Sequence, residues 1–256
     1  MSAPYDNYDY QNYWRGRDYE HESEAITLTE FFNSIPQNLN LLEIGAGFGR
    51  LIPIYAQRCR EITLLDPSSK NLHQAQKITK KLDKKIILIK GIGENLPFTD
   101  ESFDAVISVR VLHHIPNPQP LISEAHRVLK PGGYLILEFA NKLNLKSRLS
   151  SWVTGDRSLH LLHPKDLRSK SNQIKKSIPF VNHHPDFIIK TLKTASFQIL
   201  KIRSVSNLRH PFLKQLFPLK FNLQIEKLLQ QLPLFGLNYF GPSIFTLSQK
   251  PPLTEL

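Results

Sequence analysis

The sequence contains a single cysteine, Cys59, and no long apolar run. One cysteine excludes an internal disulfide and a zinc cluster built on several thiolates. No stretch of about 18 consecutive apolar residues is present, so the sequence predicts no transmembrane segment. Residues 1–14 are polar and aromatic and lack the apolar core of a secretory signal. We therefore expect a cytoplasmic protein, because a reducing compartment suits a chain with one thiol.

Acidic residues are scarce relative to basic ones: 22 against 33, which gives a formal net charge of +11. Such an excess is typical of proteins with an anionic partner, such as nucleic acid, an anionic membrane face or an acidic substrate. The lysines are scattered, however, and a solvated basic surface explains them more simply. With 256 residues, 41% of them hydrophobic, the chain is long enough for one domain with a sizeable core.

Strand-like and helix-like segments alternate along most of the chain. Strands are predicted at 39–44, 61–66, 85–90, 103–109, 134–140, 197–205 and 243–249, and helices at 20–34, 48–59, 68–82, 117–133 and 186–196. The strands are apolar on both faces, as a sheet covered on both sides requires. The sequence therefore predicts an α/β fold: a Rossmann-like, doubly wound, mostly parallel seven-stranded sheet with helices on both faces and a helical insert before the last strand.

The expected organisation is an N-terminal helical cap segment, 1–38, followed by one domain, 39–256. Two inserts interrupt that domain. Residues 142–184 are basic, serine-rich and irregular. Residues 208–240 are rich in proline, leucine and phenylalanine, including Phe212 and Phe235, and also carry basic residues. This second insert is interpreted in three ways: a lid over an apolar ligand, a basic amphipathic element on an anionic membrane, or a pair of core-packing or dimer helices.

Three glycines, Gly45, Gly47 and Gly49, follow the first strand at alternate positions in LLEIGAGFGR. Glycine permits a tight turn, positive φ and close approach of a ligand to the backbone. A dinucleotide fingerprint, G-x-G-x-x-G, requires its third glycine where Arg50 stands. The carboxylate of Glu43 would repel a pyrophosphate but suits a cationic ligand. The turn therefore favours S-adenosylmethionine (SAM), which has a sulfonium, an ammonium and no phosphate, over NAD.

The second strand ends in another acid, Asp66, followed by Pro67. In Rossmann-like folds an acid at this place accepts hydrogen bonds from ribose hydroxyls. NAD would give the same placement, so Asp66 indicates an adenosine without saying which one. A helix N-cap ahead of the next helix is the structural alternative, and both roles are compatible.

Together these motifs resemble the class I SAM-dependent methyltransferases, in the branch that includes the ubiquinone and menaquinone methyltransferases. The resemblance rests on the turn at 43–49, on Asp66, on GIGENLPFTDESFDAVISVRVLHHIP at 91–116 and on EAHRVLKPGGYLILE at 124–138. It is close over residues 39–140 and looser over 185–205 and 243–249. It implies SAM as the cofactor and S-adenosylhomocysteine as the product.

The resemblance also implies roles for individual residues. The turn from Glu43 through Ala46 to Gly49 would hold the methionine part and ribose of SAM, and Asp66 would bind the ribose diol. Residues 91–94 would line the adenine. Relatives carry G-D-A-E there, whereas this chain has Ile92, Gly93 and Glu94. Isoleucine packs on an adenine face but accepts no hydrogen bond, so adenine recognition is expected to be weaker or differently satisfied.

Arg110 follows the fourth strand, at the edge of the sheet where ligands bind in open α/β folds. Its side chain is expected either to reach the substrate or to pair with Glu43. His113 and His114 come next and are candidate general bases, with a structural hydrogen-bonding role as the alternative. No metal site is expected, because the histidine pairs are adjacent or far apart in the sequence.

The segment 13–22 resembles the helix that precedes the sheet in such enzymes. Tyr13, Arg17 and Tyr19 are expected to close over SAM, with Arg17 on its carboxylate. Aromatic packing of the first helix on the sheet is the alternative.

Methyl transfer from a sulfonium mainly requires positioning and exclusion of water, so no catalytic triad is needed. The sequence therefore predicts methyl transfer to a small-molecule acceptor, with the apolar insert slightly favouring a lipid-like or quinone-like one. Peripheral membrane contact through 208–240 is a further expectation. An RNA or protein methyltransferase is the alternative that the charge suggests, although no appended nucleic-acid module is visible. A non-catalytic subunit of the same fold is suggested by Ile92.

Overall fold

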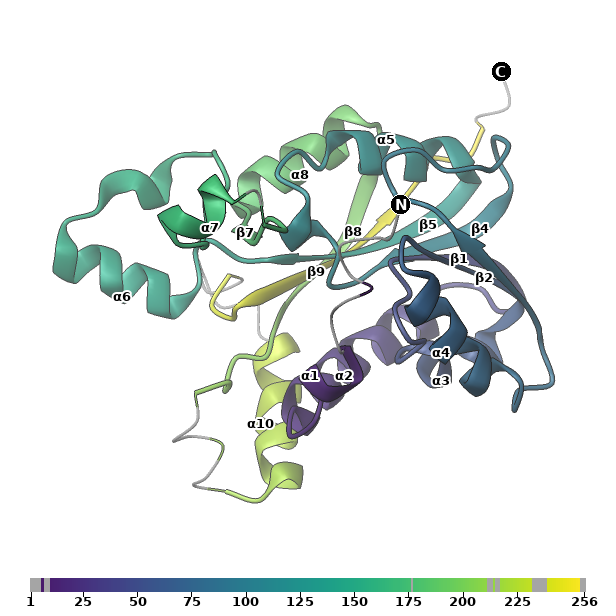
Figure 1. Ribbon diagram of the computed structural model, residues 1–256, viewed down its shortest axis with the longest axis horizontal. Coiled ribbons are helices and arrows are strands. Elements are labelled where there is room, and N and C mark those ends of the chain that lie inside the picture. Colours follow the sequence, from purple (N-terminus) through teal and green to yellow (C-terminus); the bar gives the residue numbers. More distant parts are fainter. Residues whose placement is uncertain are drawn as a thin grey trace.

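A seven-stranded sheet forms the centre of the protein (Figure 1). The computed structural model describes residue 6 and residues 10–175, 177–210, 214, 217–231 and 239–253. The strand order is β3-β2-β1-β4-β5-β9-β8, and only β9 runs antiparallel to its neighbours. The strands are β1 (Leu39–Ile44), β2 (Cys59–Asp66), β3 (Lys85–Lys90), β4 (Phe103–Ser108), β5 (Leu129–Ala140), β8 (Gln198–Val205) and β9 (Ser243–Gln249). The predicted fold class is confirmed.

Helices cover both faces of the sheet because successive strand residues point to opposite sides. Leu41 belongs to one buried cluster and the adjacent Leu42 to the other. The first cluster is covered by α2 (Asp18–Asn33), α3 (Ile52–Tyr55) and α4 (Ser69–Thr79). The second is covered by α5 (Gln119–Val128) and α8 (Pro185–Thr194).

The chain order around β1 leaves a crevice at one edge of the sheet. β1 lies between β2 and β4, so the connections leaving these strands diverge at the carboxyl end of β1. Ligands bind at such a switch point in open α/β sheets. The turn after β1 is anchored there, since the amide groups of Gly45 and Ala46 both donate to the carbonyl of Leu65 at the end of β2.

The helix predicted at 48–59 is shorter than expected. The glycine turn extends to Leu51, α3 spans only four residues and a 3₁₀ turn, η2 (Ala56–Arg58), completes the connection. Pro53 near the start of α3 has no N–H and suits only a first helical turn.

The helix predicted at 117–133 ends at Val128, and the chain continues directly into β5. Leu129 already pairs with Phe103 of β4, and an irregularity in register follows before Tyr134. Gly132 has a φ of +78° within this irregular stretch. The Pro-Gly-Gly sequence therefore ends no helix; it marks a bulge in the strand.

The segment 142–184 is more ordered than its composition predicts. It contains α6 (Leu145–Thr154), η4 (Arg157–His160), α7 (Lys170–Ile174) and a two-stranded ladder of β6 (Lys165–Asp166) and β7 (Val181–Asn182). The side chain of Asn144 caps α6 by accepting from the amide of Ser147, and Gly155 ends it in the left-handed conformation. The prediction of an irregular insert is thus wrong for α6, where capping residues outweigh a serine-rich composition.

The second insert contributes α10 (Leu219–Gln231), which packs against α2 and β8. The buried carboxylate of Glu226 accepts from the hydroxyl of Tyr19 at 2.6 Å, and Gln230 accepts from Thr27 at 2.7 Å. These contacts agree with the core-packing interpretation of 208–240. Phe212 and Phe235 lie outside the described residues. No helix in the described part of the chain combines the length and apolarity needed to cross a bilayer.

Candidate functional site

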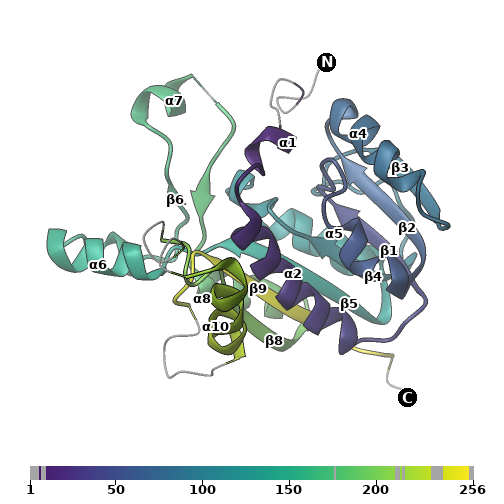
Figure 2. The same cartoon turned by 90° about the horizontal axis from the view of Figure 1, so that it is seen from below.

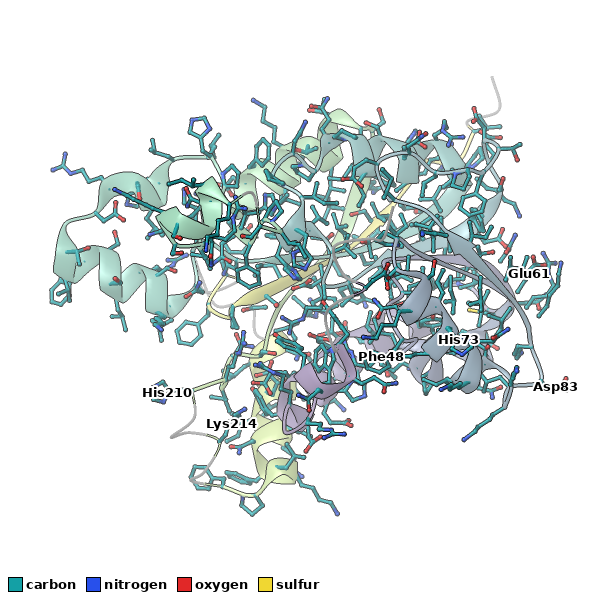
Figure 3. All side chains as sticks on the ribbon, viewed as in Figure 1. Phe48, Glu61, His73, Asp83, His210 and Lys214 are labelled. Carbon is teal, nitrogen blue, oxygen red and sulfur yellow. The ribbon has the colours of Figure 1, made fainter. Side chains whose placement is uncertain are left out.

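A cavity of about 250 Å³ opens at the carboxyl ends of β1, β2 and β4. It gathers most of the predicted cofactor residues into one place. Its walls include Glu43, Gly45, Ala46, Gly47, Asp66, Pro67, Ile92, Gly93, Glu94, Arg110 and His114. Phe48, from the same glycine turn, also lines it, and its side chain is labelled in Figure 3. Two predicted residues, Gly49 and Arg17, lie outside the lining.

The three glycines of the turn have different reasons to be glycine. All three have positive φ, between +56° and +82°. A Cβ atom at Gly45 would lie 2.2 Å from Val111, and one at Gly49 would lie 2.6 Å from Ile52. A Cβ atom at Gly47 would meet no protein atom within 4 Å. Gly49 therefore serves packing against α3 and α4, which corrects its placement in the cavity, whereas Gly47 keeps the cavity side of the turn bare.

Asp66, which is predicted to bind the ribose diol, also holds the glycine turn through hydrogen bonds. One carboxylate oxygen accepts from the amide of Gly47 and the other from the amide of Ser68, both at 2.8 Å. The N-cap of α4 is Ser68, not Asp66. Burial raises the pKa of Asp66, while these two amides oppose the rise. The carboxylate thus holds the glycine turn and faces the cavity at once.

Glu43 is almost fully buried, with 2% of its surface exposed. The hydroxyl of Tyr55 donates to its carboxylate. Burial raises the pKa of Glu43 to about 7, against the lowering effects of the Tyr55 hydroxyl and of the charge on Arg50. Because this pKa is close to neutral pH, a nearby positive charge would favour the ionised form of Glu43.

Two arginines share a single buried carboxylate on α2. Glu24 is fully buried; one of its oxygens contacts Arg50 at 2.6 Å and the other contacts Arg110 at 2.5 Å. The alternative prediction that Arg110 pairs with Glu43 is wrong, because α2 brings a closer and fully desolvated partner. The Arg50 guanidinium also lies 3.6 Å from the ring centroid of Trp14. Both arginines and Trp14 line the cavity.

The N-terminal segment lines both cavities, but of the three residues predicted to close over SAM only Tyr13 is in a lining. α1 (Tyr10–Tyr13) and Trp14 supply cavity walls. Arg17 turns back, since its Nε donates to the carbonyl of Tyr13 at 2.8 Å. Tyr19 donates to Glu226. The prediction that Arg17 reaches the cofactor carboxylate is therefore not supported by its geometry, and Arg50 is the better-placed cation.

The loop after β3 supplies the far wall. Ile92 is half exposed and lines the cavity beside Glu94. A Cβ atom at Gly93 would lie 2.7 Å from both Ile44 and Leu121, so this glycine is needed for packing. The unusual Ile92-Gly93 pair therefore preserves the shape of the loop while it presents an apolar surface to the cavity.

A second cavity, of about 420 Å³, adjoins the first and shares four lining residues with it: Tyr10, Trp14, Arg110 and His114. Much of its remaining surface is apolar, and half of its remaining lining residues come from the segment 142–184. They include Leu167, Ile178, Pro179 and Phe180, together with Tyr13, Asn144 and Arg209. Of the insert 208–240, Arg209 is the one described residue in this lining.

The two candidate bases lie where the cavities meet. His113 lines the second cavity and His114 lines both. Burial, together with the charges of His114 and Arg110, holds the pKa of His113 well below its usual value. The Nδ1 of His114 lies 2.8 Å from the carbonyl of Pro179, which fixes the proton on that nitrogen in the neutral ring. Within the described residues, no group of histidine, cysteine and acidic side chains could hold a metal ion.

Comparisons with known proteins agree with this geometry. Residues 42–137 match the family described as a methyltransferase domain. The chain is similar to a ubiquinone biosynthesis O-methyltransferase from Dechloromonas aromatica, with 33% identity over 141 residues. That match covers 54% of this chain and 59% of the relative, so the chain spans less than two thirds of the relative's length.

The chain thus contains a domain that is similar to the class I SAM-dependent methyltransferases, as the sequence predicts. Solved structures share the fold of this chain over nearly its whole length. A SAM-dependent methyltransferase from Thermotoga maritima, described as a possible histamine N-methyltransferase, has a TM-score of 0.61 at 20% identity and covers 96% of this chain and 98% of its own. A structure from Listeria monocytogenes, described as an S-adenosylmethionine-dependent methyltransferase, has a TM-score of 0.64 at 16% identity and covers 91% of this chain and 99% of its own.

The family and fold imply SAM as the cofactor. The charged residues that line the first cavity suit this ligand. SAM carries two cationic groups and one carboxylate. The lining of the cavity includes three acids, Glu43, Asp66 and Glu94, and two arginines, Arg50 and Arg110. This donor set fits a zwitterionic cation better than a diphosphate.

Several residues of the cavity are not predicted from the sequence, among them Arg50, Trp14 and Tyr10. In the sequence, Arg50 stands out only as the residue that replaces a glycine in the dinucleotide pattern. A cation one residue after the last glycine of the turn was itself a usable signal. Trp14 and Tyr10 lie far from the motifs in the sequence, and only the path of the N-terminal segment over the sheet brings them in.

Proposed function

We propose that the protein transfers the methyl group of SAM to a small apolar acceptor that carries a hydroxyl group. The observation that carries this proposal is the shared wall between the two cavities: Tyr10, Trp14, Arg110 and His114 line both. A ligand in each cavity would therefore meet at this wall, which satisfies the need of a displacement reaction for close approach of the two reactants.

The walls of the second cavity support an apolar acceptor. Leu167, Ile178 and Phe180 offer carbon surface, and polar side chains such as Asn144 and Asn182 also line the cavity. Pockets of this kind bind the apolar body of a ligand and orient it with a small number of polar contacts. The named relative acts in ubiquinone biosynthesis, whose O-methylation agrees with an acceptor of this chemistry.

His113 supports a hydroxyl acceptor. It is 7% exposed, and its ring lines the second cavity, so a ligand bound there can contact it. Because its pKa lies below 6.5, the ring is neutral near pH 7 and can accept a proton.

The reaction then needs little from the chain beyond position and one proton acceptor. When bound, SAM supplies a methyl group on a positively charged sulfur, and the carbon–sulfur bonding pair stays with the sulfur as neutral S-adenosylhomocysteine forms. The acceptor oxygen forms the new bond to the methyl carbon, and its proton passes to His113. Trp14 and Tyr10 exclude water from the shared wall.

The test uses SAM labelled in the methyl group, incubated with the full chain and with separated small-molecule, RNA and protein fractions of a cell extract. The proposal predicts label in the small-molecule fraction, in a compound that extracts into organic solvent. Label in RNA or protein would replace it with the alternative that the net charge of +11 suggests. SAM binding without transfer to any fraction would indicate a non-catalytic subunit.

His113→Gln tests the proton acceptor. We expect kcat to fall by about 10²-fold or more while SAM affinity stays unchanged. In the wild type, kcat is expected to be level near pH 7 and to fall only below pH 6.5, because the depressed pKa keeps His113 neutral to lower pH. His114→Gln is the matched control; if it removes activity and His113→Gln does not, the base has been assigned to the wrong ring.

A further inference from the structure

The helix α6 projects from the body of the molecule in both ribbon views (Figures 1 and 2). None of its residues is buried. Four apolar residues, Leu145, Leu149, Trp152 and Val153, recur at i, i+4, i+7 and i+8, which places them on one face of the helix. Trp152 is 83% exposed and Val153 is 76% exposed. Apolar side chains gathered on one exposed face mark an interaction surface.

Basic residues border this apolar face. At 100° per residue, Lys146 falls on one side of the stripe and Arg148 on the other, while the opposite face holds serine and threonine. A helix with an apolar face flanked by lysine and arginine is typical of elements that lie in the boundary between water and lipid. At 10 residues, α6 is about 15 Å long, which suits lying along a bilayer but not crossing it.

The segment around α6 carries far more basic than acidic residues. Residues 142–184 contain nine lysines and arginines but only two aspartates. Both aspartates already have partners, since Asp156 pairs with Lys165 at 3.4 Å and Asp166 pairs with Arg168 at 2.7 Å. A second copy of this chain is a poor occupant, because two basic surfaces repel each other. An anionic partner is required.

We propose that α6 and its basic surroundings dock onto a membrane surface rich in anionic lipid. Nucleic acid would satisfy the basic residues but offers no apolar layer for a stripe of leucine and valine. A lipid boundary accommodates both, with headgroups for Lys146 and Arg148 and acyl chains for the stripe. This assigns membrane contact to α6, not to the insert 208–240.

The position of α6 relates this surface to the second cavity. Asn144, the N-cap of the helix, also lines that cavity. An apolar acceptor dissolved in the same lipid would thus have a short route to the site. This consequence rests on the proposed function, whereas the docking itself does not.

The first test is co-sedimentation of the full chain with vesicles. Wild type is expected to pellet with vesicles that contain phosphatidylglycerol, to remain in solution with pure phosphatidylcholine, and to dissociate as salt rises from about 0.1 M to about 0.5 M. The triple variant Leu149→Glu/Trp152→Glu/Val153→Glu is expected to bind anionic vesicles about tenfold more weakly or worse. Because all three residues are exposed, its circular dichroism and SAM binding should match the wild type.

Two matched variants control for the added charge. Leu253→Glu changes a residue that is 79% exposed near the C-terminus and should pellet like the wild type. Leu228→Glu changes an exposed residue of α10 and should also pellet like the wild type. Loss of binding in Leu228→Glu with retention in the triple variant would overturn the assignment to α6 and point to 208–240.

Tryptophan fluorescence gives a direct reading, since the chain has only two tryptophans. In Trp14→Phe, Trp152 is the sole reporter, and its emission should shift to shorter wavelength on adding anionic vesicles. An unshifted spectrum, a wild type that stays in solution with anionic vesicles, or retention of bulk RNA in place of vesicles would each overturn the proposal.

Discussion

At the scale of single residues, glycines set the shape of the cofactor cavity and a buried acid sets part of its charge. Gly47 leaves open space beside the cavity, whereas Gly45 and Gly49 make room for protein atoms. Glu43 places an acid in the same wall, but burial holds its pKa near neutrality. Glu43 can therefore gain or lose its negative charge near neutral pH, and a bound cation would favour the ionised form.

Gly47→Ala should weaken SAM binding by about tenfold or more, because the added methyl group occupies space next to the cavity. Gly132→Ala is the matched control: its φ is also positive, at +78°, and its Cβ atom also meets nothing within 4 Å, but it lies outside the cavity. Both variants should lose about 1–2 kcal/mol of stability from backbone strain. Equal SAM affinity in the two variants, measured by calorimetry, would show that the turn does not face the cofactor.

Glu43→Gln tests the raised pKa. A folded-state pKa of about 7, above the ordinary 4.5, means that the folded protein holds this proton more tightly than the unfolded chain. The resulting contribution to the free energy of unfolding is present below pH 4.5 and is lost as the pH rises through 7. The stability of the wild type relative to Glu43→Gln should therefore fall by about 3 kcal/mol between pH 4.5 and pH 8. Urea unfolding at several pH values measures it, and a constant difference would contradict a raised pKa.

At the scale of elements, α2 connects the cofactor cavity to the second insert. Its Glu24 holds Arg50 and Arg110 on the cavity side. Its other side meets α10, where Glu226 accepts from Tyr19 and from the amide groups of Ser206 and Asn207. Lys214, labelled in Figure 3, adds an ion pair to Glu20 of α2 at 3.0 Å. The insert thus supports the helix that positions the arginines.

Glu226→Gln should destabilise the protein by about 2–4 kcal/mol, because an amide nitrogen replaces an acceptor among buried donors. Lys227→Ala, an exposed neighbour on the same helix, should change stability by less than about 0.5 kcal/mol. Chemical denaturation of both variants provides the comparison. If the two variants unfold alike, the contact of α10 with α2 contributes little.

At the scale of the whole molecule, the sheet was predictable because its signals are local. Apolar runs such as LNLLEI and the glycine turn specify strands and the switch point wherever they occur. Residues at or just after the ends of these strands, such as Asp66 and Arg110, could be assigned to the cavity once the strands were predicted. What escaped prediction depends on long-range placement: Trp14 over Arg50, and Glu24 between two arginines. The helix α6 escaped for a different reason: the serine-rich composition of its segment predicts irregular structure, although Asn144 and Gly155 cap the helix.

The central claim is that the cavity at the end of β1 was built for a cationic nucleoside without phosphate. Titration calorimetry of the full chain with SAM, and separately with NADH, tests it most directly. The account predicts saturable binding of one SAM molecule per chain and no heat from NADH. Binding of NADH with no binding of SAM would contradict it.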